Sequence, residues 1–490
     1  MFIGIDSGTS SVKAVLVDED EVELAGAEVA LSPAFPRSGW VEDDPENWWR
    51  AAVACLDRLA GEQPLAMSGV TAIGLSGQMH SALLLDGADR PVRPAILWND
   101  GRAGTEAAEL ARDVPALAAK LGVLPMPGFT GPKLLWLARH EADNFSRARS
   151  LCFAKDYLRL RLCGEKATDV TDASGGWLLD QQTRAWSAEA LAACGAGHLA
   201  LPPVLESPAP TGLLRAELAA RWGMGRRVAI AAGAGDTAAG GIGIGAIEAG
   251  QGFLSLGTAA QIFLAGRRFA PDPQRLVHAF CHALPGRWYT MAAMLNGASP
   301  LAAVAQWLGG RPLGEWLAEV ERDFAGPSRL LALPFLFGER TPHNDPHARG
   351  AFIGMDGATT PGDLMQAMLE GIAFALADGL DALVDGGETV ESLALIGGGA
   401  RSAFWGRIIA SVLDLPLRRH AGSERGPAFG AARLARLAAT GETVEQVVTA
   451  PPLLDVIAPD PALAALYRPR RESFQQLYTA LRPILAPHAG

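Results

Sequence analysis

Two aspartates stand where an apolar, strand-like run gives way to small residues. Asp6 follows residues 2–5, Phe-Ile-Gly-Ile, and precedes Ser-Gly-Thr-Ser-Ser. Asp236 lies in "GAGDTAAGG", directly after the largely apolar residues 228–232. Small residues leave backbone N–H groups open to the oxygen atoms of a ligand. Both positions therefore favour a carboxylate beside a phosphate-binding turn.

A second Gly-Thr pair occurs half a chain away from the first. Gly8-Thr9 lies in "IDSGTSSVKAVLV" and Gly257-Thr258 lies in "LSLGTAAQIFLAG". Each segment predicts a β-hairpin with a small-residue turn, because apolar residues alternate on both sides. We interpret the two segments as an internal duplication, while a chance recurrence of so short a pattern stays open.

The glycine-rich turns fit a triphosphate better than the standard nucleotide motifs. The chain has no GxxxxGK[ST] sequence, and "GAGDTAAGG" is not a GxGxxG followed by a ribose-binding acid. A third turn, residues 397–399, is Gly-Gly-Gly between an apolar strand pattern and a helical pattern. Two hairpin turns that face each other across a cleft can hold a triphosphate, with the third turn on the adenosine.

Each aspartate also has a structural alternative. Asp6 can bind a divalent cation beside a triphosphate, or it can cap its own turn. Asp236 can act as a base at the floor of a cleft, or as the N-cap of a helix that begins at Thr237. The residues alone leave these alternatives open.

Alternating strand and helix patterns must position these groups. Strands are expected at residues 1–6, 12–18 and 21–31, and a strand, a turn and a second strand over residues 70–86. A helix is expected over 43–61, with Asp44 as N-cap, Pro45 at its first position and Gly61 at its end. Helical patterns dominate residues 101–210, where we expect insertions that shape a substrate site. The alternation predicts a doubly wound α/β layout in both halves.

Length and charge limit the class of protein. A chain of 490 residues is too long for one core, so two or more domains are expected. The net charge of −11 argues against nucleic-acid binding. We interpret the one dense basic patch, residues 467–474, as an exposed helix start. The sequence shows neither a basic leader nor an apolar run long enough to span a membrane, so we expect a cytoplasmic protein with no membrane partner.

Cysteines and histidines give no metal pattern. The five cysteines are scattered and never in CxxC spacing, which indicates neither a disulfide framework nor a zinc site; they are Cys55, Cys152, Cys163, Cys194 and Cys281. The runs "HAFCH" at 278–282 and "HNDPH" at 343–347 lack helical i, i+4 geometry. We interpret both as structural or substrate-domain loops and expect no zinc.

Nine segments, spread in order from residue 2 to about residue 440, resemble the FGGY family of carbohydrate kinases. They include "IGIDSGTSSVK", "GLSGQMHSALLLD", "PGFTGPKLLWL", "GAGDTAAGGIG" and "LIGGGARSAFWGRIIA". "GIDSGT" alone is shared with actin and chaperone ATPases. The pieces "GQMH", "WNDGR", "FCHALPGRW" and "GERTPHNDP" are most similar to the xylulokinase branch of the family.

The resemblance implies an α/β fold with two actin-like (ribonuclease H-like) ATPase domains flanking a catalytic cleft. Residues 1–245 would bind the sugar and carry the base and the first phosphate hairpin. Residues 246–490 would carry the second hairpin and bind adenosine. The resemblance also implies ATP-dependent phosphorylation of D-xylulose to D-xylulose 5-phosphate in pentose catabolism, with ATP and Mg²⁺ as cofactors. A homodimer stays open.

Other activities remain as alternatives. The same chemistry on ribulose, a hexulose or glycerol is the nearest, because pocket side chains rather than the fold select the substrate. An ATPase switch of the actin or chaperone type is disfavoured, because few residues follow the matched segments. A sugar sensor without activity is disfavoured because Asp6 and Asp236 are both present.

The resemblance also implies roles for individual residues. Asp236 is the general base, and Asp6 is a catalytic carboxylate that holds Mg²⁺, partly through water. The implied substrate-binding residues are Met79, His80, Trp98, Asn99, Asp100 and Asp236. The implied nucleotide-binding residues are Thr9, Ser10, Lys13, Gly257, Thr258, Gly398, Gly399 and Ala400.

Two positions depart from the family pattern. Thr237 stands where the family usually has Asn after the base, which puts one side-chain hydrogen bond to sugar or phosphate in doubt. Ala259 stands where the second hairpin usually has Ser, which removes one hydroxyl donor. Backbone N–H groups can still make the phosphate contact, so we expect binding to be retained.

Overall fold

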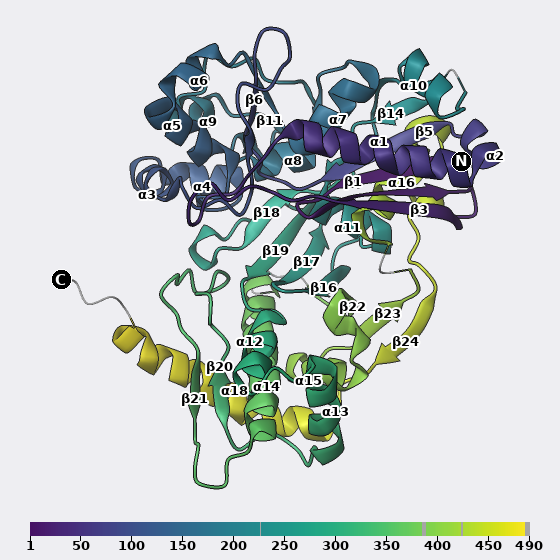
Figure 1. The fold of residues 1–490 in the computed structure, drawn as a ribbon. Coiled ribbons are helices and arrows are strands. Elements are labelled where there is room, and N and C mark those ends of the chain that lie inside the picture. Colours follow the sequence, from purple (N-terminus) through teal and green to yellow (C-terminus); the bar gives the residue numbers. More distant parts are fainter. Residues whose placement is uncertain (226, 385–388, 423–424, 486–490) are drawn as a thin grey trace.

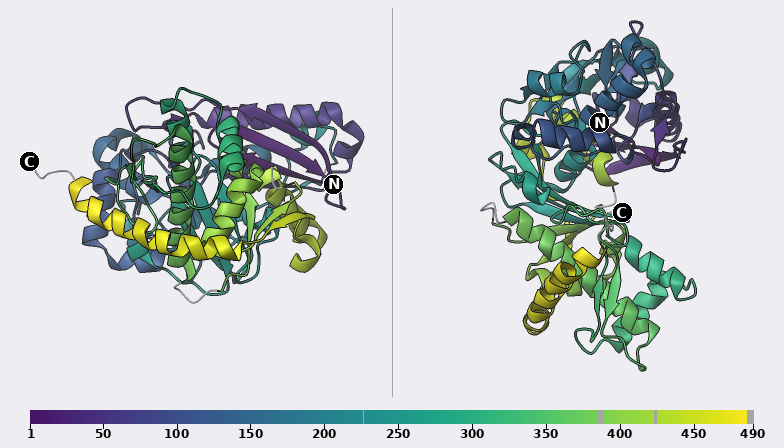
Figure 2. Two further views of the ribbon diagram at one scale, coloured as in Figure 1. Left: turned by 90° about the horizontal axis from the view of Figure 1, so that it is seen from below. Right: turned by 90° about the vertical axis from the view of Figure 1, so that its left-hand side faces the viewer.

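Two seven-stranded sheets, each covered by helices, build two lobes (Figure 1). The computed structural model describes residues 1–225, 227–384, 389–422 and 425–485. The lobes lie one above the other, as the right-hand view of Figure 2 shows. The predicted α/β class is confirmed. No helix in the described ranges is long and apolar enough to cross a membrane.

The first sheet has the order β13-β14-β5-β1-β2-β3, with β15 also paired to β5. Its strands are β1 (Phe2–Ser7), β2 (Ser11–Val17), β3 (Glu23–Ala30), β5 (Ala72–Gly77), β13 (Pro210–Leu213), β14 (Ala229–Ala231) and β15 (Ala234–Gly235). β1 and β2 form the predicted hairpin, and β5 runs parallel to β1, β14 and β15. The ends of these parallel strands therefore meet at one edge of the sheet.

Helix α1 (Pro45–Glu62) covers β2 and β3 of this sheet. Its N-terminus is as predicted, because the Asp44 carboxylate accepts a hydrogen bond from Glu46 N at 3.0 Å and Pro45 follows the cap. Its predicted end is wrong by one residue: the helix continues through Gly61 to Glu62. Gly61 has no neighbour within 4 Å of a built Cβ, so nothing forces the chain to turn there.

Short elements fill the rest of the first lobe, in agreement with the helical patterns seen over residues 101–210. The helices are α2 (Pro64–Ser68), α3 (Gly104–Asp113), α4 (Ala116–Leu121), α5 (Thr130–His140), α6 (Ala142–Arg147), α7 (Ala154–Cys163), α8 (Val170–Gly175), α9 (Ala188–Ala193) and α10 (Ala216–Arg221). The short strands are β4 (Glu42–Asp43), β6 (Leu83–Leu85), β7 (Ala95–Ile96), β8 (Ser150–Cys152), β9 (Thr168–Asp169), β10 (Leu179–Asp180), β11 (Ala185–Trp186) and β12 (Val204–Leu205).

The second sheet has the order β18-β19-β17-β16-β22-β23-β24. Its strands are β16 (Gly252–Leu256), β17 (Ala260–Gly266), β18 (His278–Cys281), β19 (Trp288–Met294), β22 (Leu393–Ile396), β23 (Leu417–His420) and β24 (Leu453–Ile457). The predicted hairpin is β16-β17. Other elements are α12 (Ser299–Trp307), α13 (Leu313–Asp323), β20 (Leu331–Leu333), β21 (Ala351–Ile353), α14 (Pro361–Val384), α15 (Ala403–Leu413), α17 (Val444–Val447) and α18 (Pro461–Leu485).

The basic patch at residues 467–474 lies inside α18 rather than at a helix start, which corrects the sequence prediction. Two of its arginines are engaged with the second lobe. Arg470 donates to Leu330 O at 2.5 Å, and Arg471 forms an ion pair with Asp378 at 2.8 Å. The patch therefore fastens α18 to the domain.

Helix α16 (Gly426–Thr440) comes late in the chain but packs on the first sheet and on α11 (Asp236–Ile244). Glycines permit this approach. Gly4 and Gly74 are paired across β1 and β5, and a Cβ at either would lie 1.8 Å from a carbonyl oxygen of α16. A Cβ at Gly430 of α16 would likewise lie 1.8 Å from Ala239 O of α11. The backbone of α16 thus lies directly against β1, which carries Asp6, and against α11, which begins at Asp236.

Replacing Gly74 by Ala should destabilise the protein strongly, because the added methyl meets helix backbone that cannot move aside. We expect a loss of about 3 kcal/mol in the free energy of unfolding, measured by urea denaturation. Gly61→Ala is the matched control. It adds the same methyl to an open helix position and should raise stability by up to about 1 kcal/mol. Equal stability of the two variants would contradict the close packing of α16.

Candidate active site

Strand register brings the two predicted aspartates together. Asp6 is paired with Ser76 across β1 and β5, and Ser76 is paired with Ala234 across β5 and β15. Asp236 follows two residues after Ala234, as the first residue of α11. In open α/β sheets, ligands bind at this carboxyl edge of parallel strands. The two carboxylates therefore lie at the expected place for chemistry.

The environment of each carboxylate favours its neutral form. Burial raises the pKa of Asp6 to about 6, although the Ser76 hydroxyl donates to Asp6 Oδ1 at 2.9 Å and the charge of Lys13 opposes the shift. Burial raises the pKa of Asp236 to about 7, and the nearby negative charge of Asp6 adds to it. A carboxyl group poised near neutral pH is suited to accept a proton from an alcohol.

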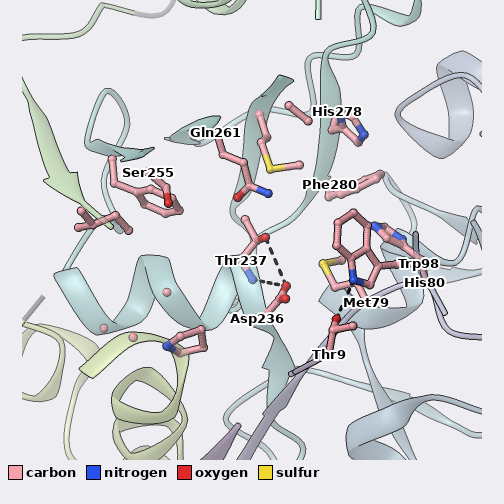
Figure 3. A pocket seen from close by; sticks show the side chains of 18 of the residues that line it. Thr9, Met79, His80, Trp98, Asp236, Thr237, Ser255, Gln261, His278 and Phe280 are labelled. Carbon is pink, nitrogen blue, oxygen red and sulfur yellow. Dashed lines mark hydrogen bonds between the residues drawn. The ribbon is translucent and has the colours of Figure 1, made fainter. Parts of the chain in front are cut away.

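Thr237 is the closest partner of Asp236. Its backbone N–H donates to Asp236 Oδ1 at 2.7 Å, and its hydroxyl donates to the same oxygen at 3.4 Å (Figure 3). Gly235 rather than Asp236 occupies the N-cap position of α11. The departure from the family's Asn thus places a short hydroxyl beside the carboxylate, and the structural alternative of an N-capping aspartate does not hold.

Asp236 lines a cavity of about 340 Å³ between the two lobes. Predicted residues that share this lining are Thr9, Met79, His80 and Trp98. Figure 3 shows the Trp98 ring above Thr9, and Trp98 Nε1 donates to Thr9 Oγ1 at 2.8 Å. The side chain of Trp98 keeps 37% of its surface exposed, so its face is accessible to a ligand.

His80 is held in one tautomer. Its backbone has a φ of 68°, and its ring Nδ1 lies 2.5 Å from Gly175 O, so Nδ1 carries the proton and donates to that carbonyl. Burial lowers the pKa of His80 to about 3. The imidazole is therefore neutral, and its Nε2 is an acceptor for a hydroxyl group.

Lys133 anchors the two turns that carry His80 and Trp98. Its fully buried ammonium donates to His80 O at 3.0 Å and to Leu97 O at 2.6 Å. The two acceptors belong to the turns that carry His80 and Trp98. Burial lowers the pKa of Lys133 because it penalises the charged form of the amine. The hydrogen bonds to these carbonyl groups stabilise the ammonium against that cost.

Asn99 and Asp100 are placed differently from Trp98. Asn99 is exposed, and Asp100 is buried with both oxygens engaged. Arg102 donates to them at 2.9 and 2.7 Å, and Val41 N donates at 2.5 Å. Asp100 therefore shapes the loop behind Trp98, and direct contacts of either residue with a sugar stay a prediction.

The residues predicted to bind nucleotide gather at the ends of β16 and β22. Gly257 and Thr258 form the turn after β16, where Ala298 N donates to Gly257 O at 2.8 Å. Gly398–Arg401 form a 3-10 turn after β22, which runs parallel to β16. A Cβ at Gly399 would lie 2.7 Å from the Leu256 side chain. The turn after β16 and the turn after β22 are thus adjacent. Within the first of these turns, Ala259 O accepts a hydrogen bond from Gly257 N.

The remaining predicted nucleotide residues lie on the first hairpin. Ser10 is exposed in its turn, and Lys13 is paired with Asp6 across β1 and β2. Ala400 lies within the 3-10 turn beside Gly398 and Gly399. The structure therefore places them on the elements expected, while contact with a nucleotide stays a prediction.

Two family models match the chain. The N-terminal domain of the FGGY family of carbohydrate kinases matches residues 1–243, and its C-terminal domain matches residues 252–439. The chain belongs to the FGGY family of carbohydrate kinases. The predicted family is confirmed, and the chain is a carbohydrate kinase that phosphorylates a sugar.

Individual relatives cover the chain nearly completely. It is 42% identical over 487 residues to a xylulose kinase of Escherichia coli strain K12, covering 99% of this chain and 100% of the relative. A xyloylose kinase from Brucella ovis has a crystal structure with a TM-score of 0.96, 43% identity and 99% coverage of both chains. A ligand bound xylulose kinase from Lactobacillus acidophilus has a TM-score of 0.92 and 25% identity over 98% of both chains. These similarities confirm the two-domain fold.

Sequence reasoning missed several residues of this kinase's cavity. They are Phe129, Ser255, Gln261, His278, Phe280 and Arg340. His278 lies on strand β18 rather than in the loop expected for "HAFCH", and its ring packs 5.6 Å from that of Phe280. Gln261 is paired with Ser255 across β16 and β17. For Ser255, Gln261 and His278, a polar residue on an otherwise apolar strand was the available signal.

The raised pKa of Asp236 predicts a pH-dependent cost to stability. The folded protein holds the proton up to about pH 7 and the unfolded chain only to about pH 4, so stability is lost as pH rises through this range. Asp236→Asn should therefore raise the midpoint of thermal unfolding at pH 8 clearly more than at pH 4. The same change at exposed Asp20 should leave both midpoints unchanged. A shift that is equal at both pH values would contradict the raised pKa.

Proposed function

We propose that this carbohydrate kinase transfers the γ-phosphoryl group of ATP to the hydroxyl on carbon five of D-xylulose, in pentose catabolism. The observation that carries the proposal is Asp236, whose pKa lies at about 7 on the floor of the cavity between the lobes. Similarity to xylulose kinases over nearly the whole chain supports the choice of sugar. The proposal includes a cytoplasmic location and leaves a homodimer open.

Asp236 acts as the general base in this mechanism. Thr237 donates only to Oδ1, which leaves Oδ2 to accept the proton of the attacking hydroxyl. The hydroxyl oxygen bonds to the γ-phosphorus as the bond to the leaving ADP oxygen breaks. The backbone N–H groups of the Gly8-Thr9 and Gly257-Thr258 turns donate to the charge on the transferred group.

Mg²⁺ fits the residues present, because carboxylate oxygens are the ligands that this cation prefers. Asp6 would hold it, with Ser76 orienting one carboxylate oxygen. When bound there, Mg²⁺ would supply positive charge to offset the negative charge of the phosphate groups of ATP. A cation at this place would also offset the repulsion between Asp6 and Asp236 that raises the pKa of the base.

The sugar lies between Asp236 and the aromatic wall. Trp98 offers a ring face to the C–H surface of a sugar, Met79 packs beside it, and His80 Nε2 accepts from a hydroxyl. Closure of the two lobes would exclude water, which competes with the sugar as phosphoryl acceptor. The second candidate is the same reaction on another ketose or polyol.

The decisive test is an ADP-release assay over D-xylulose, D-ribulose, a hexulose and glycerol. Wild type should turn over D-xylulose best, and Asp236→Asn should lower kcat by about 10²- to 10⁴-fold, the usual contribution of a general base. Affinity for ATP, measured by calorimetry, should stay within about threefold, because Asn keeps the shape of the side chain.

Two outcomes would overturn parts of this proposal. Strong turnover of glycerol or ribulose with none of xylulose would overturn the substrate. Full activity of Asp236→Asn would overturn the base.

The pH profile gives an independent test. Because only ionised Asp236 can accept a proton, kcat/KM for the sugar should fall tenfold for each pH unit below about 7. Affinity for ATP should change little between pH 6 and pH 8 in a direct binding assay. A profile that stays flat down to pH 5 would show that this carboxyl group does not limit the reaction.

A further inference from the structure

Arg340 brings a guanidinium to the cavity without any partner for it in the part of the chain described. It lines the cavity together with His80, His278 and Asp236, and it makes neither a side-chain hydrogen bond nor an ion pair there. Burial lowers the pKa of Arg340, and the charge of neighbouring Glu339 opposes this shift. A partly buried cation without a partner is costly, so a ligand that supplies acceptor atoms gains from meeting it.

The backbone on both sides of Arg340 is firmly anchored. The Glu339 carboxylate accepts hydrogen bonds from Arg340 N at 2.7 Å and from Asn296 Nδ2 at 2.9 Å, so it is already engaged. On the other side, Thr341 N donates to Ala293 O at 3.2 Å, and Thr341 Oγ1 accepts from Ala293 N at 3.2 Å. Glu339 and Thr341 therefore fix this segment to β19, and Arg340 is presented from a rigid support.

Arg340 lies at the histidine end of the cavity. Its positive charge contributes to lowering the pKa of both His80 and His278, whereas the pKa of Asp236 responds to the charge of Asp6. The rings of His80 and Phe280 lie 6.5 Å apart, and those of His278 and Phe280 lie 5.6 Å apart, so these residues form one wall. Arg340 thus lies close to the wall that His80 and His278 help to form.

The guanidinium of Arg340 and Nε2 of His80 have opposite hydrogen-bonding properties at this wall. A guanidinium only donates hydrogen bonds, while Nε2 of neutral His80 only accepts them. A carbonyl oxygen only accepts, and the hydroxyl on the next carbon can donate. An α-hydroxy ketone therefore satisfies both residues at once, whereas a polyol offers a second hydroxyl whose proton has no acceptor at Arg340.

We infer that Arg340 binds the carbonyl oxygen of the acceptor sugar, while His80 accepts from the adjacent hydroxyl, so that the pair selects a ketose over the corresponding polyol. This inference rests on the proposed function and names the part of the substrate that the second lobe recognises. Arg340 is a substrate-binding residue in this arrangement, and it takes no part in proton transfer. A cation at this cavity could also meet the γ-phosphate of ATP, and the experiment separates the two ligands.

The test compares D-xylulose with xylitol and D-arabinitol, the two products of reducing its carbonyl. Arg340→Met should lower kcat/KM for D-xylulose by about 10- to 100-fold, mainly through KM, since one charge-assisted hydrogen bond is lost. For the two alditols kcat/KM should change by less than about threefold, because the hydroxyl that replaces the carbonyl carries a proton with no acceptor at Arg340, which offsets what its oxygen gains by accepting from the guanidinium. The ratio of ketose to alditol activity therefore collapses, while KM for ATP stays the same.

Arg349→Met is the matched control on the same loop. Arg349 is exposed and donates to Pro346 O and Ala348 O, outside the cavity lining. Its replacement should leave the ratio unchanged. Arg340→Lys keeps the charge but not the planar fork, and it should lower the ratio by an intermediate amount. This variant carries the test if Arg340→Met fails to fold, as judged by thermal unfolding.

Three outcomes would overturn the inference. Equal losses for ketose and alditols would show a general or structural role for Arg340. A raised KM for ATP with unchanged sugar selectivity would assign it to the phosphate. An unchanged ratio in folded Arg340→Met would remove it from the site. Failure of the proposed function is distinct, because it appears as missing turnover of D-xylulose in wild type.

Discussion

The parallel pairing of β5 with both β1 and β15 is the constraint on which the site depends. Asp6 and Asp236 are far apart in the chain, and burial is the largest cause of the raised pKa of each. Ser76 of β5 lies in register with Asp6 on one side and with Ala234 on the other. A one-residue slip in either ladder would turn a whole strand over, so the position of both carboxylates is fixed by the same register that fills the core.

The packing of α16 extends this constraint to the second lobe. This helix follows β23 in the chain, yet its backbone lies against Gly4 and Gly74 and against α11. The strand that carries Asp6 and the helix that begins at Asp236 are therefore supported by one element. Such close backbone contact tolerates little sliding. Any relative motion of the lobes that opens the cavity must therefore leave α16 packed against β1, β5 and α11.

Much of this arrangement could be predicted from the sequence. The strand-turn-strand patterns gave both hairpins and placed Asp6 and Gly257-Thr258 in or beside their turns, because alternation and glycine act locally. The resemblance of short motifs gave the family and pointed to Met79, His80 and Trp98, which line the cavity with Asp236. These features share one property, namely that a few neighbouring residues determine them.

The rest depended on contacts that no local pattern reveals. In the sequence, Gly4 and Gly74 look like ordinary strand residues. A side chain is excluded at both because a helix more than 350 positions later packs against them. Asp100 read as a polar group near the sugar, but Arg102 and Val41 engage its carboxylate. His278 read as part of a loop, although its strand pairs with β19 and turns it to the cavity. Tertiary partners decided each case.

The polar groups of the cavity are divided by charge, and this division gives a bound sugar its direction. Asp236 lines one part of the cavity and is influenced by the charge of nearby Asp6, and the proposed mechanism brings the transferred phosphoryl group to this part. Arg340 and two neutral histidines occupy the other end, where a donor-only cation and an acceptor nitrogen face uncharged ligand oxygens. A sugar with a carbonyl group at one end and a hydroxyl at the other fits this polarity in one orientation. Reversal would leave the guanidinium facing a hydroxyl proton and the base facing a carbonyl that has no proton to give.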